Sequence, residues 1–278
     1  MTDPAVRGAA VSGAAGGPTT FVVLAGQRAG VVNPLAARAG VSHKCLVPIC
    51  GKALVWWVVE ALLDADAEAE IRLVLEEDGI AQVSAQLPRL GASAARVRFV
   101  PGATSLLDSV LAATADLAGP VIVTTADNVL LTPEAVAQVH GALAHGEAVF
   151  ALARREAVLA AHPDGQRNFY RFRDGEYANC NIYGLAGPHA LRAAEAFRGG
   201  GQFMKSRKRM VDAFGLLNIA LLALGLLDLK SAARRLSRRF GVTITPTVFR
   251  DGALAIDVDN ERTFAVCEEL LARRIRAT

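Results

Sequence analysis

The sequence predicts an α/β fold, with a single Rossmann-like sheet that is mixed but mainly parallel and is flanked by helices. Short apolar runs alternate with helical stretches through the first half of the chain, which is typical of parallel β-α-β units. These runs are almost entirely apolar, as expected for strands of a sheet that is covered on both faces. The 278 residues are 52% apolar, which allows a large buried core and excludes disorder for most of the chain.

The first half of the chain begins with the strand 21–24 (FVVL), and we expect a long loop from there to about Lys52. The next helix carries two tryptophans, and the strands after it are short and buried. Thr132 is expected to cap a later helix, because Pro133 suits its first position and Glu134 suits the positive end of its dipole. The elements between are the helix 53–65, the strands 71–75, 97–100 and 120–125, and the helix 105–115.

The second half has a different pattern. Residues 166–173 (QRNFYRFR) partly alternate polar and apolar side chains, as an antiparallel or edge strand does. A second strand is expected over 178–185, joined to the first by a turn at Asp174-Gly175. Residues 1–19 read as a disordered tail without a signal-peptide core. We therefore expect one domain over 20–278, with a nucleotide-binding half at about 20–147 and an acceptor-binding half at about 148–278.

Composition excludes several classes of protein. The net charge of +3 is too small for a polybasic nucleic-acid binder, so no nucleic-acid partner is expected. The four cysteines lack C-x-x-C spacing, which disfavours structural zinc and a disulfide scaffold and favours a reducing cytoplasm.

The loop after the first strand has the features of a phosphate site. Small residues at 25–30 (AGQRAG) allow backbone N–H groups to approach phosphate oxygens, and Arg28, Lys44 and Lys52 can neutralise the charge. The spacing matches neither the G-x-x-x-x-G-K-[ST] loop nor the G-x-G-x-x-G loop. ATPase and dehydrogenase functions are therefore disfavoured.

Four segments resemble a known family. They are LAGQRAG at 24–30, HKCLVPICGKAL at 43–54, VTTADN at 123–128 and AIDVDN at 255–260. Together they resemble nucleotidyltransferases with a glycosyltransferase-A-like fold, and within these the molybdenum-cofactor-guanylyltransferase-like (MobA-like) group. The resemblance spans about residues 20–275.

The resemblance implies an enzyme that transfers NMP from an NTP to a phosphorylated small-molecule acceptor, with Mg²⁺ as cofactor and release of pyrophosphate. CTP and GTP are the favoured donors, and a sugar phosphate or a lipid-headgroup precursor is the expected kind of acceptor. Arg28 and Lys44 would be catalytic, and Asn181 would contact the acceptor. The nucleotide would be bound by Leu24, Ala25, Gly26, Lys52, Ser105 and Ser109, although Ser105 can equally be a helix cap.

Carboxylates follow two apolar segments. Asp127 comes directly after the strand 120–125, where an open sheet places its ligand sites, and Mg²⁺ prefers carboxylate ligands. Asp257 and Asp259 are both candidates for a second ligand, and their spacing alone does not choose between them. The resemblance points to Asp259, with Asp257 structural or outside the metal's direct ligands. Asn260 is expected to cap the last helix.

Two alternatives stay open. A glycosyltransferase of the same fold usually carries Asp-x-Asp at the middle site, whereas this chain has a single carboxylate in 127–129 (DNV). The second alternative is a non-catalytic nucleotide-binding scaffold. It stays open because the first loop lacks a glycine of the family pattern and Ala53 replaces the usual proline.

A basic run at 205–209 (KSRKR) precedes 15 uncharged residues at 213–227, which are too few to span a bilayer. This segment is expected to be a buried helix or a homodimer face, or else a peripheral membrane contact through 205–227. Arg234, Arg235, Arg238 and Arg239 form a further basic cluster. The cysteine pattern gives the cytoplasm as the expected location, and this segment leaves membrane association open.

Overall fold

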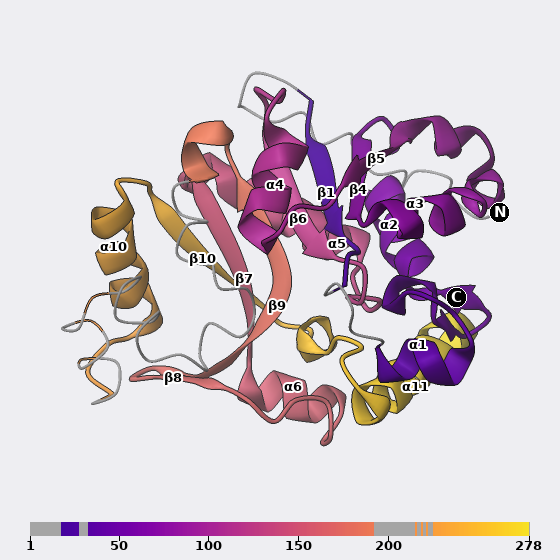
Figure 1. Ribbon diagram of the computed structural model, residues 1–278. Coiled ribbons are helices and arrows are strands. Elements are labelled where there is room, and N and C mark those ends of the chain that lie inside the picture. The colour runs from indigo at the N-terminus through magenta and orange to yellow at the C-terminus, as the bar shows by residue number, and fades with distance from the viewer. Residues whose placement is uncertain are drawn as a thin grey trace, which may run out of the picture.

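A central sheet of eight strands organises the computed structural model, which describes residues 18–27, 33–191 and 225–277 and the isolated residues 215, 218 and 221 (Figure 1). The order is β10-β7-β9-β6-β1-β4-β5, with β8 paired to β9. Residues 1–17 of the predicted tail 1–19 lie outside the described residues, as do Arg28, the basic run 205–209 and most of 213–227. The prediction was wrong for Thr19, which is buried next to β1. The strands are β1 (Thr20–Leu24), β4 (Glu70–Leu75), β5 (Val97–Pro101), β6 (Val121–Thr125), β7 (Ala148–Arg154), β8 (Tyr170–Phe172), β9 (Gly175–Leu185) and β10 (Ile244–Phe249).

The sheet is mixed but mainly parallel, as predicted. β1 pairs in parallel with β4 and β6, β4 with β5, and β7 with β10. β9 is antiparallel to both of its neighbours in the strand order, β6 and β7. The carboxyl ends of β1, β4 and β6 therefore meet at one edge.

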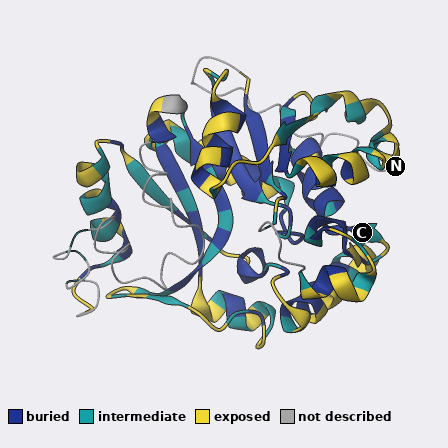
Figure 2. Cartoon of the chain, in the orientation of Figure 1, coloured by how far each residue is buried: buried dark blue, intermediate teal, exposed yellow. Residues whose placement is uncertain are grey.

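Helices cover both faces of the sheet, and the strands are the most buried part of the chain (Figure 2). Phe21 and Val23 of β1 belong to the larger core, together with residues of α2 and α5, whereas Val22 belongs to a second core that includes Val110 of α4. This alternation follows from the two-residue period of a strand. The helices are α1 (Pro34–Ala39), α2 (Leu54–Ala65), α3 (Glu77–Ser84), α4 (Leu106–Thr114), α5 (Pro133–Ala142), α6 (Arg155–Ala161), α10 (Leu229–Phe240) and α11 (Glu261–Ala277).

Two local predictions were wrong. The expected loop before Lys52 contains α1, which starts at Pro34 because the Asn33 side chain accepts hydrogen bonds from the Leu35 and Ala36 amides. It also contains the short hairpin of β2 (Pro48–Ile49) and β3 (Lys52–Ala53). The strand expected over 166–173 is reduced to β8. The Gln166 side chain accepts hydrogen bonds from the backbone N–H groups of residues 167 and 168, which are then not available for strand pairing.

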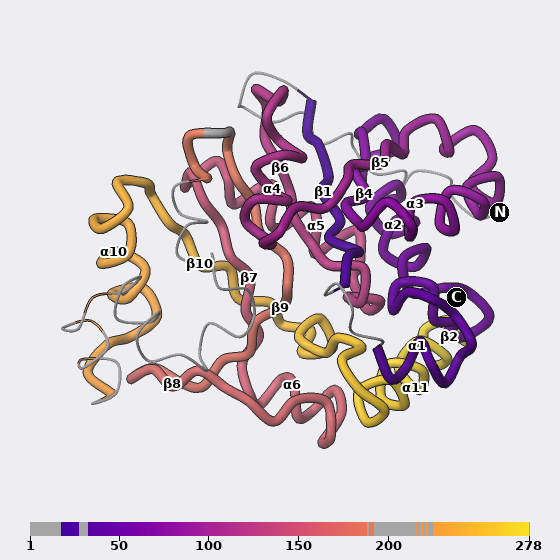
Figure 3. Tube along the Cα trace, viewed as in Figure 1, coloured from indigo at the N-terminus to yellow at the C-terminus, as the bar shows by residue number. Residues whose placement is uncertain are grey.

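The last described helix packs against the first one at one side of the sheet. α11 lies next to α1 (Figure 3), where the Arg38 guanidinium contacts Glu261 and lies 4.7 Å from the centre of the Phe264 ring. The start of α11 is fixed by Asn260, whose side chain accepts hydrogen bonds from the amides of residues 262 and 263, as predicted. This packing places the segment before α11 next to the end of β6.

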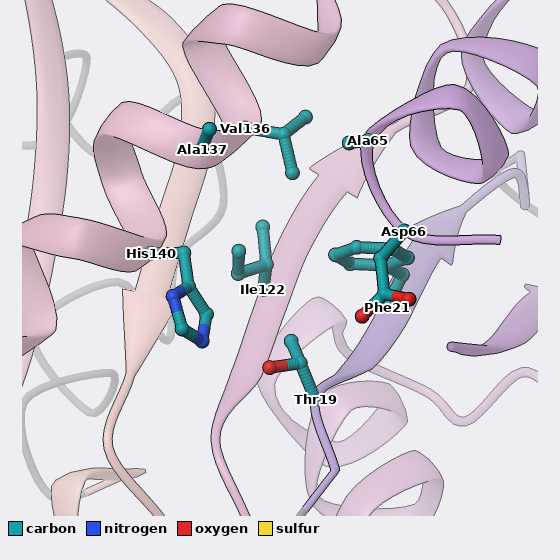
Figure 4. Close-up of a pocket in the computed structure, with 8 residues that line it drawn as sticks. All are labelled: Thr19, Phe21, Ala65, Asp66, Ile122, Val136, Ala137 and His140. Carbon is teal, nitrogen blue, oxygen red and sulfur yellow. The ribbon is translucent and has the colours of Figure 1, made fainter. Parts of the chain in front are cut away.

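A cavity of about 10 Å³, with room for one water molecule, lies beside the start of β1 (Figure 4). It is lined by residues that include Thr19, Asp66 and His140. His140 is buried, its Nε2 atom has no hydrogen-bond partner within the described part of the chain, and burial lowers the pKa of its imidazole. Among the described residues, no helix is long and apolar enough to cross a membrane.

Candidate active site

Three carboxylates converge at the carboxyl edge of the sheet. Asp127 follows β6, and Asp257 and Asp259 lie between the helical turn Gly252–Ala255 and α11. One oxygen atom from each carboxylate lies within 4.8 Å of the others. The Val258 amide donates to the Asp127 carbonyl at 3.1 Å, which ties the two segments together.

The backbone around Asp257 and Asp259 is not a strand. The Asp259 amide donates to the Asp257 carbonyl at 3.1 Å and to Thr263 Oγ1 at 2.8 Å, which bends the chain sharply before α11. The two side chains therefore reach the cluster through a bend rather than from one face of an extended strand.

Lys44 supplies the positive charge of this cluster. Its Nζ atom lies 2.5 Å from Asp127 Oδ2 and 3.4 Å from Asp259 Oδ1. Burial by itself lowers the pKa of Lys44, but Asp127, Asp259 and Asp257 outweigh it and the pKa is raised. Lys44 is therefore a firmly charged cation at this edge.

The carboxylates exceed the charge that Lys44 can balance. Burial, and to a smaller extent the negative charges of Asp127 and Asp259, raise the pKa of Asp257 to about 8. The Oδ1 atom of Asp127 is buried and makes no hydrogen bond to any of the described residues. An orphaned carboxylate oxygen beside two further carboxylates is the donor set that suits a hard divalent cation.

The first loop lies against Glu76, a residue that sequence reasoning noted only as the end of a strand. The Gln27 amide donates to Glu76 Oε1 at 2.9 Å. A Cβ atom at Gly26 would lie 2.9 Å from the same oxygen, so a larger residue there would displace the Glu76 carboxylate. Leu24 and Ala25 precede this contact at the end of β1. The signal that could have identified Glu76 is its place directly after β4, the neighbour of β1.

The two predicted serines both hold the loop that follows β5. Ser105 caps α4 by accepting from the Asp108 amide at 3.1 Å. Ser109 is buried, and its hydroxyl accepts from the Ala103 amide at 2.9 Å. The loop lies next to Glu76, since the Gly102 amide donates to the Leu75 carbonyl.

Two further predicted residues have partners that the sequence did not suggest. Lys52 contacts Glu60 and lies 4.0 Å from the centre of the Trp57 ring, so its ammonium is engaged on α2. Asn181 donates from Nδ2 to Asp257 Oδ2 at 2.8 Å. The structure thus brings Lys44, Asp127, Asp259 and Asn181 to one cluster, whereas Lys52 is held by α2.

The chain is similar to several known proteins. The family model described as the MobA-like NTP transferase domain matches residues 21–213. A structure described as a hypothetical transferase from Thermus thermophilus is 28% identical, with a TM-score of 0.71 over 89% of this chain and 99% of that chain. No curated protein matches the sequence.

Two more distant structures share the fold. One is 4-diphosphocytidyl-2C-methyl-D-erythritol synthase from Anaerococcus prevotii, which is 11% identical with a TM-score of 0.58 over 92% of this chain and 99% of that chain. The other is CMP:2-keto-3-deoxy-manno-octonic acid synthetase complexed with CTP, which is 14% identical with a TM-score of 0.55 over 93% of this chain and 100% of that chain. At these identities the likeness establishes the architecture alone.

Proposed function

The chain belongs to the MobA-like NTP transferase family and is a nucleotidyltransferase, and from this premise we propose a specific reaction. It transfers NMP from CTP or GTP to a phosphorylated small molecule, such as a sugar phosphate or a lipid-headgroup precursor. An acceptor phosphate oxygen attacks the α-phosphorus, the bond to the β-phosphate oxygen breaks, and pyrophosphate leaves. The observation that carries the proposal is the contact of Lys44 with Asp127 and Asp259, beside the loop at the end of β1.

Asp127 and Asp259 are the residues proposed to hold Mg²⁺, as nucleotidyltransferases of this family typically depend on a metal ion. The free Oδ1 atom of Asp127 supports this role. When bound there, Mg²⁺ would neutralise charge on the phosphate oxygens. Asp257 would contribute negative charge next to these two ligands.

Lys44 is proposed to stabilise the negative charge that builds up at the transferred phosphate. An ammonium held in place by two carboxylates needs little reorganisation when that charge develops. Arg28 would act with it, as the sequence suggests. Lys52 could join them only by leaving Glu60 and Trp57.

Glu76 supports a donor nucleotide whose base carries an amino group. Its Oε1 atom accepts from the Gln27 amide, while its Oε2 atom is buried, lies 3.9 Å from His43 Nε2 and makes no hydrogen bond to any residue that the structure describes. A carboxylate oxygen only accepts, so it suits the amino group of cytosine, guanine or adenine, whereas uracil has a carbonyl oxygen in place of cytosine's amino group. Ser105, Ser109 and the 24–26 segment would line the same pocket.

The nucleotide is assigned to the half at about 20–147 and the acceptor to the half at about 148–278, where Asn181 would touch the acceptor with its second amide hydrogen. A peripheral membrane contact or a homodimer face is proposed for the region around 205–227. On the neighbouring α10, exposed Lys230, Arg234 and Arg238 lie four residues apart on one face. Their positive charges favour contact with an anionic membrane surface.

The test is pyrophosphate release with each of the four NTPs and Mg²⁺ across a panel of sugar, polyol and glycerol-type phosphates. The Asp127→Asn variant is expected to be inactive, and the matched variant Asp64→Asn, at an exposed position on α2, is expected to retain full activity. Release with one NTP and one acceptor would fix the substrates. Nucleotide binding without release for any acceptor would favour the nucleotide-binding scaffold, and absence of both would refute the proposed reaction.

A further inference from the structure

We infer that Asn181 is a positioning residue that holds Asp257 in the carboxylate cluster, and that Asn179 and Tyr183 fix Asn181 in turn. The inference rests on the proposed function for its catalytic meaning. Four side chains form one connected chain of hydrogen bonds from β9 to the cluster. None of these contacts follows from the resemblance, which directs Asn181 at the acceptor.

The backbone of β9 is distorted so that Asn181 can make this contact. Phe150 and Leu152 of β7 are two residues apart, but their partners Tyr183 and Asn179 are four apart, so β9 carries extra residues at 180–182. Asn181 itself has φ +50°, a left-handed conformation that is uncommon for residues other than glycine and that asparagine tolerates best.

The distortion is stabilised from the neighbouring strand. Thr124 Oγ1 donates to the Asn181 carbonyl at 2.8 Å, and Asn128 Nδ2 donates to the Cys180 carbonyl at 3.0 Å. Both carbonyls of the bulge are therefore satisfied although they leave the regular ladder. Strained backbone that is held this firmly is typical of functional sites.

The hydrogen bonds leave the Asn181 amide one orientation. Asn179 Nδ2 donates to Asn181 Oδ1 at 2.7 Å and to Tyr183 Oη at 2.6 Å. With its oxygen facing Asn179, Asn181 must present its NH₂ group to Asp257 Oδ2, 2.8 Å away. Loss of this donor would leave Asp257 free to turn away from Asp127 and Asp259.

The test measures Mn²⁺ binding to the metal-free full chain by electron paramagnetic resonance, without nucleotide. Asn181→Gly removes the amide and keeps the left-handed backbone, and Asn168→Gly is the matched control at an exposed position. We expect Asn181→Gly to weaken Mn²⁺ binding roughly 10- to 100-fold, as loss of a residue that supports the charged groups around a metal site from outside its direct ligands does, and the control to bind as the wild type. Tyr183→Phe removes one hydroxyl and should weaken binding less.

A change of less than about threefold in Asn181→Gly would overturn the inference, and so would a wild-type chain that binds no Mn²⁺. If Asn181→Gly does not fold by circular dichroism, Tyr183→Phe decides by the same threshold. Pyrophosphate release is measured in parallel, where the KM for Mg²⁺ should rise while the KM for the NTP stays unchanged. Weakened Mn²⁺ binding without any wild-type turnover would refute the proposed reaction and leave the positioning role in place.

Discussion

Asp257→Asn is expected to stabilise the metal-free protein at neutral and alkaline pH. The ordinary pKa of 3.8 is raised to about 8 in the folded chain, mainly by burial and then by Asp127 and Asp259. The folded state therefore binds more protons than the unfolded state between these two values. Stability conferred by the protonated form is fully present below pH 3.8 and is lost as the pH rises towards about 8.

The magnitude follows from the same window. At pH 7 the solution is about 3 pH units above the ordinary pKa of an aspartate, and each unit is worth about 1.4 kcal/mol. The free energy of unfolding of Asp257→Asn can therefore exceed that of the wild type by at most about 4 kcal/mol. Solvent screening at this half-buried position reduces the expected gain to about 2 kcal/mol. The asparagine can still accept the hydrogen bond from Asn181, so packing should change little.

Urea unfolding in the presence of a chelator, from about pH 5 to about pH 8, measures this effect. The free energy of unfolding of the wild type should fall relative to that of Asp257→Asn as the pH rises, and Asp64→Asn should track the wild type. Parallel curves for wild type and Asp257→Asn would refute the charge argument. Added Mg²⁺ should narrow the difference, because a bound cation stabilises the ionised carboxylates.

Four other results are expected. Lys44→Ala should lower kcat/KM for pyrophosphate release by about 10²- to 10³-fold, since it removes a preorganised cation. Glu76→Gln should reduce the preference for an amino-bearing NTP over UTP by about tenfold, measured as a ratio of kcat/KM. His140→Gln should unfold less readily on acidification below pH 6.5, because the lowered pKa of His140 makes the folded protein lose stability as its imidazole must charge. Reversing the charges of Arg234 and Arg238 should abolish flotation with anionic vesicles at low salt.

Specific outcomes would contradict each of these. Full activity of Lys44→Ala would remove the ammonium from the reaction, and an unchanged base preference in Glu76→Gln would place the base elsewhere. Identical acid unfolding of wild type and His140→Gln would mean that the imidazole is already solvated in the folded chain. Absence of flotation of the wild-type chain would remove the membrane contact.

Much of the site could be predicted because its residues follow recognisable strands. Asp127 comes directly after the apolar run of β6, and parallel strands bring their carboxyl ends to one edge. The segment at 43–54 identified Lys44 through its resemblance to a family, and the structure brings the two residues to 2.5 Å. Patterning thus predicts which edge is functional.

The missed contacts depend on residues far apart in the chain. The bond between Asn181 and Asp257 spans 76 positions, and the one between Gln27 and Glu76 spans 49. The bulge in β9 orients the Asn181 side chain towards Asp257. It also interrupts the two-residue alternation on which strand prediction depends. The contact of Lys52 with Trp57 could not be predicted, because it depends on how β3 packs against α2.

The pairing of α1 with α11 also has a consequence for biosynthesis. Lys44 and Asp127 are translated long before Asp259. The Asp259 amide donates to Thr263 at the start of α11, where Asn260 caps the helix, and the ion pair of Arg38 with Glu261 holds α11 against α1. A ribosome-bound polypeptide that has not yet released α11 therefore has an incomplete site, whatever the state of its central sheet. Catalytic competence would then require α11, so that chains made only as far as Asp127 cannot consume nucleotide.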